Sequence, residues 1–142
     1  MGLVHLLFGS REKPIAIIHN VLGEEIDRIA GVHDLQHLDL RGRQWACADL
    51  RKFSLAFSDC EGINLLGANL TGVNFFRANL RGADLSFSKV EGARFCKADL
   101  IDCSFYEAQT GWPYHTHFGH GADFREAKID HTTDIRGRWG TS

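Results

Sequence analysis

The chain has 142 residues and a formal net charge of −2, with 16 Lys and Arg against 18 Asp and Glu. This balance excludes a protein that binds nucleic acid mainly through a basic surface, so we expect no direct nucleic-acid binding. The length and a hydrophobic content of 44% suit a single domain with a continuous core. No apolar run approaches the roughly 20 residues of a membrane-spanning helix, so we expect no membrane association.

Residues 1–32 carry no repeat. Within them, the run PIAIIHNVLG predicts a strand, and EEIDRIAG predicts a short helix with apolar residues at Ile26, Ile29 and Ala30. The segment lacks the basic start of a signal peptide, which favours a cytoplasmic protein. We interpret residues 1–32 as a cap on the repeats that follow, and a partner-binding arm is the alternative interpretation.

A repeat of five residues begins at His33 and continues without a slip to Trp112, giving sixteen blocks. The third position is apolar in fifteen blocks, and Thr110 is the exception. The second position is Asp or Asn in ten blocks, and Gly fills the fifth position in six. A period of five fits neither a simple helix nor a simple strand. It fits a chain that turns a corner every five residues, with four sides in each coil of about 20 residues stacked at strand spacing.

The blocks ADLRK, ANLTG, ANLRG, ADLSF and ADLID resemble the motif of the pentapeptide-repeat family, which is small–Asp/Asn–Leu–x–x. The resemblance covers residues 32–112 firmly and 121–131 more weakly. It implies an all-β fold, the right-handed quadrilateral β-helix, with about four to five coils in residues 33–139. Residues 140–142 would form a short tail.

The twenty-residue coil assigns the third positions to four internal ladders. These are Leu40, Cys60, Leu80 and Leu100; Trp45, Leu65, Leu85 and Phe105; Leu50, Leu70, Val90 and Thr110; and Leu35, Leu55, Phe75 and Phe95. Cys60 and Cys103 are therefore expected in the core, and Cys47 and Cys96 outside it. All four are expected to be reduced thiols.

After Thr110 the five-residue frame breaks, which predicts an inserted loop over residues 111–120. We expect Phe124 to resume the frame above Phe75 and Phe95, and Ile129 to lie above Leu100. Trp139 would then cover the open end of the stack, where edge hydrogen bonds and core are exposed.

The sequence shows no catalytic motif, so we expect neither enzymatic activity nor a cofactor. His115, His117 and His120 are a weak candidate metal site, because imidazole binds zinc, copper or nickel but HxHxxH is not a standard spacing. A loop of stacked aromatic and histidine side chains, built on Trp112 and Tyr114, is the favoured interpretation.

Several outward positions of the repeat carry large apolar residues where polar residues or Gly are usual. The candidate interface comprises Phe57, Leu66, Phe76, Phe87, Tyr106, Trp112 and Tyr114. If they form a continuous stripe, they indicate a partner or a dimer. We therefore expect a non-enzymatic scaffold for protein–protein interaction, with an unidentified protein partner and a possible homodimer through one end of the β-helix.

The resemblance also implies an alternative function. Some pentapeptide-repeat proteins resemble duplex DNA in shape and charge, bind DNA gyrase and protect it against quinolones. That mechanism requires an acidic surface, whereas the sixteen blocks contain ten Asp or Glu and nine Lys or Arg. The balance favours the scaffold over the DNA mimic.

Overall fold

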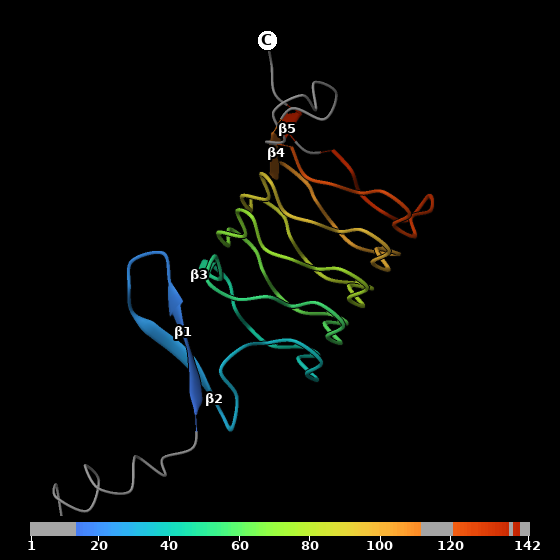
Figure 1. The fold of residues 1–142 in the computed structure, drawn as a ribbon. Coiled ribbons are helices and arrows are strands. Elements are labelled where there is room, and N and C mark those ends of the chain that lie inside the picture. The colour runs from blue at the N-terminus through green and yellow to red at the C-terminus, as the bar shows by residue number, and fades with distance from the viewer. Residues whose placement is uncertain (1–13, 112–120, 137, 140–142) are drawn as a thin grey trace, which may run out of the picture.

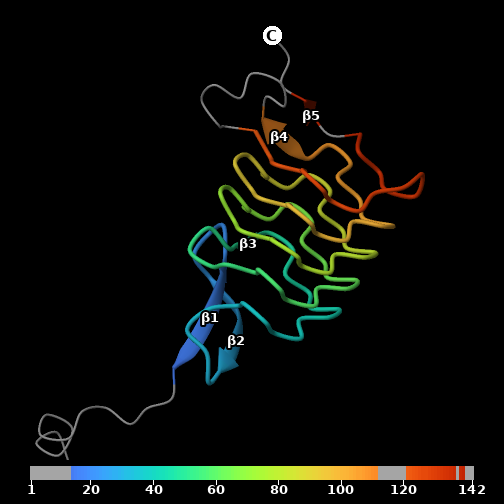
Figure 2. The same ribbon diagram turned by 45° about the vertical axis from the view of Figure 1, so that its right-hand side comes forward.

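The computed structural model describes residues 14–111, 121–136 and 138–139, which form an all-β structure. Its strands are β1 (Ile15–Asn20), β2 (Glu25–Ala30), β3 (Ala48–Asp49), β4 (Gln109–Gly111) and β5 (Arg138–Trp139). Figure 1 shows the β1–β2 hairpin beside a stack of coils, and Figure 2 shows the same stack turned. Within the described part of the chain, no helix is long and apolar enough to cross a membrane.

Parallel β-bridges join residues that are twenty positions apart along the repeat. Asp39 pairs with Asp59, Asp59 with Asn79, and Asn79 with Asp99. The chain also turns at the fourth and fifth residues of each block. The twenty-residue repeat of the stacked coils is therefore confirmed, and the fold is a β-helix.

Every backbone amide in the block 78–82 has an acceptor. The first bonds to Phe75 O within the turn (3.0 Å), the second to the preceding coil (2.9 Å), and the third and fifth to the following coil (2.8 and 3.0 Å). The fourth, Arg81 N, donates to the side-chain oxygen Oδ1 of Asn79 at 3.1 Å. This last bond explains the preference for Asp or Asn at the second position, because a short side-chain oxygen completes the turn.

The core lies inside the coils and consists of the predicted ladders. All sixteen of their members are buried, with at most 1% of each residue exposed. Phe75 and Phe95 stack with ring centroids 5.0 Å apart, and Phe124 continues the column at 5.1 Å from Phe95. Cys60 and Cys103 are buried as predicted, whereas Cys47 is exposed and Cys96 half-buried, and all four are free thiols.

The repeat frame resumes after the break with a changed offset. Arg94 pairs with Asp123, 29 positions on, so nine residues are inserted into that coil. Ser104 pairs with Asp134, 30 positions on, which adds one more residue. The predicted positions of Phe124 and Ile129 in the stack are thereby confirmed. Of the predicted loop at residues 111–120, Gly111 is the last residue of β4, and residues 112–120 lie outside the described part of the chain. The side chain of Trp139 is also outside the described part.

The predicted strand near the N-terminus is present as β1, but the helix predicted for EEIDRIAG is wrong. Residues Glu25–Ala30 form β2, which pairs antiparallel with β1 from Ile15↔Ala30 onwards. The Asn20 side-chain oxygen accepts bonds from the amides of Leu22 and Glu24, at 2.9 and 3.0 Å, and closes the hairpin turn. Pairing with β1 and the β-branched Ile26 and Ile29 favour the strand over the helix.

The hairpin joins the first coil through both of its strands. β1 pairs antiparallel with β3, with His19 opposite Asp49 and Asn20 opposite Ala48. Ile18 of β1 is fully buried in the core. From β2, Asp27 Oδ2 accepts a hydrogen bond from Trp45 Nε1 at 2.7 Å. Residues 14–30 therefore share a core with the coils.

We predict that Asp27→Ala loosens the hairpin, because it leaves the buried Trp45 N–H without its acceptor. An unsatisfied buried donor costs about 1–3 kcal/mol. Chemical denaturation should show this loss of unfolding free energy, and Glu24→Ala in the exposed turn serves as the control. Equal stability of Asp27→Ala and wild type would show that the contact does not hold the hairpin.

We predict that Leu80→Asp prevents folding. Leu80 is fully buried within a ladder, and an unpaired carboxylate there costs several kcal/mol against a typical total stability of about 5–15 kcal/mol. Circular dichroism and thermal melting measure the effect, with Arg81→Asp at the neighbouring exposed position as the control. A folded Leu80→Asp protein with an unchanged melting temperature would contradict the ladder assignment.

Candidate functional site

Two columns of aromatic side chains follow the axis of the coils, and all their members are exposed except the half-buried Phe76. The first aromatic column comprises His37, Phe57 and Phe76: His37 and Phe57 are stacked at 4.8 Å between ring centroids, and Phe76 meets Phe57 edge-on at 5.5 Å. The guanidinium carbon of Arg77 lies 5.5 Å from the Phe76 ring centroid. Phe57 and Phe76, two residues of the predicted interface, are thus in contact.

The second aromatic column comprises Phe87 and Tyr106, which meet edge-on at 5.6 Å between ring centroids. Arg136 extends it, with its guanidinium carbon 5.2 Å from the Tyr106 ring centroid. Leu66 lies on the same side of the β-helix, at a corner of a neighbouring coil, and is also exposed. Tyr106 of the second column is 30 positions after Phe76 of the first column, which is one and a half coils of twenty residues. The two columns therefore lie on opposite sides of the β-helix, and the predicted residues form two surfaces.

Three members of these columns, His37, Phe57 and Phe87, have backbone conformations that favour glycine. Phe57 and Phe87 both have φ of 59°. At the corresponding corner one coil before Phe87, the chain has Gly67 with φ of 67°. A left-handed conformation costs a residue other than Gly about 1–2 kcal/mol. Phe87 recovers little of this by burial, because it is 55% exposed.

The remaining predicted site residues lie outside the described part of the chain. They are Trp112, Tyr114, His115, His117 and His120. Among the residues that the structure does describe, no group of three or more His, Cys, Asp or Glu is arranged to hold a metal ion.

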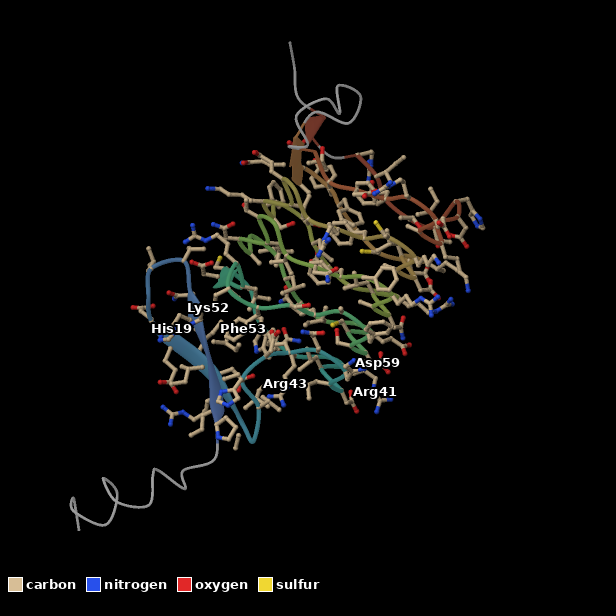
Figure 3. All side chains as sticks on the ribbon, in the orientation of Figure 1. His19, Arg41, Arg43, Lys52, Phe53 and Asp59 are labelled. Carbon is tan, nitrogen blue, oxygen red and sulfur yellow. The ribbon has the colours of Figure 1, made fainter. Side chains whose placement is uncertain are left out.

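On the side of the β-helix that contains Asp39, the second-position residues of successive coils form a column that is mostly aspartate. Nearby cations balance the charge of these aspartates. Arg41 forms an ion pair with Asp39 at 2.7 Å and lies 3.7 Å from Asp59. Figure 3 labels Arg41 and Asp59, which lie side by side. Higher in the stack, Arg81 lies 3.4 Å and Lys128 3.9 Å from Asp99. The carboxylates of this side are therefore largely neutralised by neighbouring arginines and a lysine.

Sequence reasoning missed a groove between β1 and the first coil, where Figure 3 shows His19, Lys52 and Phe53 close together. One hollow of about 380 Å³ is lined by His19, Asp49, Arg51 and Lys52. An adjoining hollow of about 290 Å³ shares His19 and Lys52 and extends to the apolar residues of β1, to His33 and to Phe53. We call the two hollows together the β1 groove.

The sequence contained two signals for this groove. Lys52 occupies a corner that the next coils build with Gly72 and Gly92, and Phe53 occupies a first position where the next coils have Val73 and Ala93. Neither signal could reveal the groove, because its other wall is β1, whose pairing with the coil depends on the folded structure.

Three of the four thiols have a raised pKa. Burial raises the pKa of Cys60 to about 12, and burial likewise raises the pKa of Cys103. Partial burial followed by the neighbouring Asp123 raises the pKa of Cys96. Because the thiolate is the nucleophile, these three groups are unreactive at neutral pH.

Comparison with known proteins agrees with this geometry. The family model for pentapeptide repeats (8 copies) matches residues 48–86 and 78–109. Among solved structures, the pentapeptide repeat protein Rfr23 of the cyanobacterium Cyanothece 51142 is 21% identical over 61% of this chain and 52% of its own, with a TM-score of 0.53. This likeness shows the β-helix fold alone. No curated protein matches the chain.

Two further solved structures show weaker similarity. A pentapeptide repeat protein from the Arabidopsis thaliana thylakoid lumen is 26% identical over 66% of this chain and 62% of its own, with a TM-score of 0.43. HetL of the cyanobacterium Nostoc sp. strain PCC 7120, involved in heterocyst differentiation regulation, is 24% identical over 63% of this chain and 38% of its own, with a TM-score of 0.29. The chain thus spans between about 38% and 62% of the length of these three proteins.

Stacked coils with a five-residue motif and a bridge every twenty residues define a solenoid protein of the β-helix class. The chain belongs to the family of pentapeptide repeat proteins. Members of this family are generally non-enzymatic repeat scaffolds.

The paired aspartates predict a loss of stability in acid. The side-chain bond from Arg41 lowers the pKa of Asp39 from 3.8 to about 2, and that from Arg136 does the same for Asp134. A carboxyl whose pKa is lower in the folded state stabilises the fold above its unfolded value, and this contribution disappears as the pH falls through the folded value. The melting temperature should therefore fall between about pH 4 and pH 2, by a small amount because both pairs are exposed to solvent.

The Asp39 contribution can be isolated by an NMR titration of its carboxyl group. Arg41→Gln removes the side-chain bond and should return the Asp39 pKa toward 3.8. Arg77→Gln, which removes an exposed cation beside Phe76, should leave it unchanged. An Asp39 pKa that is the same in wild type and Arg41→Gln would show that the ion pair does not form in solution.

Proposed function

We propose that this protein is a non-enzymatic scaffold that binds a protein partner through its aromatic columns. The support is the combination of exposure and backbone conformation at Phe57 and Phe87, which are 43% and 55% exposed at positive φ. Other corners of this chain with positive φ have Gly, or polar residues such as Arg77 and Lys97. A large exposed aromatic side chain adds apolar surface at such a corner without relieving the conformation, which favours a role in binding. Aromatic side chains flanked by arginine are also typical anchors of protein interfaces.

The DNA-mimic alternative receives less support. A mimic needs carboxylates that face a partner with their charge unbalanced. On the side that carries Asp39, Asp59 and Asp99, each of these residues has a cation within 4 Å. Binding and protection of a topoisomerase therefore remains the second hypothesis.

The proposal includes the finer architecture expected from the sequence. We propose a right-handed coil of quadrilateral cross-section, with about four to five coils in residues 33–139 and with residues 1–32 as a cap. The burial of Ile18 and the contact of Asp27 with Trp45 support the cap. A homodimer would use the far end of the stack, where Ile129 and Ile135 are exposed beside an apolar hollow of about 150 Å³. The cytoplasmic location also stays a prediction.

The interface can be tested by affinity purification from the native host followed by binding measurements across a salt series. We expect Phe87→Ala to weaken binding by about 1–3 kcal/mol, the usual range for an interface anchor. Leu22→Ala removes a more exposed apolar side chain outside the columns and should have no effect. Because burial of apolar area drives the interaction, added salt should change the affinity little. A steep salt dependence with unchanged binding by Phe87→Ala would reject the aromatic interface and favour mimicry.

A further inference from the structure

The β1 groove is formed by residues that are far apart in sequence but held together by backbone pairing. Its floor is fixed where His19 of β1 pairs with Asp49 of β3. Phe53 and Ala16 are 7% and 2% exposed, so the wall beneath the groove is part of the core. A volume of about 380 Å³ for the first hollow falls in the range of about 300–1,000 Å³ of small-molecule sites.

The charges around the groove leave one cation without a carboxylate. Arg51 is already engaged by two bonds to Asp49, at 2.9 and 2.7 Å. Across the described residues, no carboxylate lies within ion-pair distance of Lys52. Its ammonium group lies over the ring of Phe53, 5.3 Å from nitrogen to centroid, and it interacts with the Asp49 carboxylate only at longer range. With neutral histidines, the lining residues therefore carry a net charge of +1 from Asp49, Arg51 and Lys52.

The groove offers further donors and an apolar surface beside this charge. His19 and His33 line it from β1 and from the start of the first coil, and an imidazole N–H is a hydrogen-bond donor. Ile15 and Ile17 contribute hydrocarbon from the outward edge of β1. A ligand that matches all of these groups carries one negative charge and an apolar part.

We propose that the β1 groove binds an organic carboxylate. Its carboxylate group pairs with the Lys52 ammonium and accepts hydrogen bonds from His19 or His33, and its apolar part lies against Phe53 and Ile15. A phosphate dianion fits less well, because Asp49 adds a negative charge to the rim and Lys52 is the one cation there without a carboxylate. This site is separate from the aromatic columns, so it stands or falls independently of the proposed interface.

The proposal can be tested by NMR titration of the full chain with four small probes: benzoate, acetate, benzamide and inorganic phosphate. Benzoate carries both charge and ring, acetate lacks the ring, and benzamide lacks the charge. We expect benzoate to shift the amide resonances of His19 and Lys52 and to bind at least about ten-fold more tightly than the other three probes, since each of them lacks one matching feature.

Two variants separate a specific site from general attraction to positive charge. Lys52→Ala should weaken benzoate binding by at least about ten-fold, the effect of losing a charge-assisted bond. Lys89→Ala is the matched control, because it removes an exposed lysine two coils further along the same side, in the bridge series Asp49, Asn69 and Lys89. It should bind benzoate as wild type does, and both variants should keep the wild-type melting temperature.

Three outcomes would overturn the proposal: no benzoate shift at His19 or Lys52, equal weakening by the two variants, or equal or tighter binding of benzamide or phosphate.

A further experiment distinguishes the source of the carboxylate. A short peptide ending in phenylalanine with a free C-terminus is compared with its amidated form and with benzoate. Tighter binding of the free peptide than of benzoate supports the C-terminus of a protein as the source, and tighter binding of benzoate supports a small acid.

Discussion

The hydrogen bonds between successive coils are the constraint on which the rest of this structure depends. In the block 78–82, the second, third and fifth amides bond to neighbouring coils, the first bonds within the turn, and the fourth bonds to the second-position side chain. The fourth-position amides of Arg51, Leu66 and Ile101 are satisfied in the same way. Buried backbone groups without partners are costly, so this arrangement fixes the twenty-residue register. Once the register is fixed, the third positions must point inward and the corner residues outward. The core and the surface columns are consequences of the same ladder.

This dependence explains which features could be predicted from the sequence. The period of five assigns every ladder residue. Taking Phe124 as a resumed third position also predicts that it lies above Phe95, although nine residues are inserted before it. It gives no information about Glu25–Ala30, where Ile26, Ile29 and Ala30 fit a helical face as well as a strand. The outcome there is decided by β1 as a pairing partner. The β1 groove was unpredictable for the same reason, since one wall comes from a segment without a repeat.

The regular ladder also determines how charge is distributed on the surface. In the pairs Asp39–Arg41, Asp49–Arg51 and Asp123–Arg125, an arginine two positions after the aspartate folds back onto it. The same carboxylate already accepts the amide of that arginine, so one side chain serves the turn and the ion pair together. Exposed pairs of this kind add little stability. Their effect is to leave the sides of the β-helix nearly neutral, so aromatic and apolar groups are what distinguish one surface from another.

The β1 groove forms where the parallel stack of coils meets the antiparallel β1–β2 hairpin. The coils stack as parallel strands with a bridge at each second position, whereas β1 runs antiparallel to β3 and continues into β2. Where β1 leaves the coil, the next corner at Lys52 and Phe53 lies above the start of the repeat at His33, and the hollow is found between them and β1. The indole of Trp45 anchors β2 through Asp27 on one side of this junction, and Lys52 remains on the other. The junction at which the repeat begins thus places a hollow beside the Lys52 ammonium group.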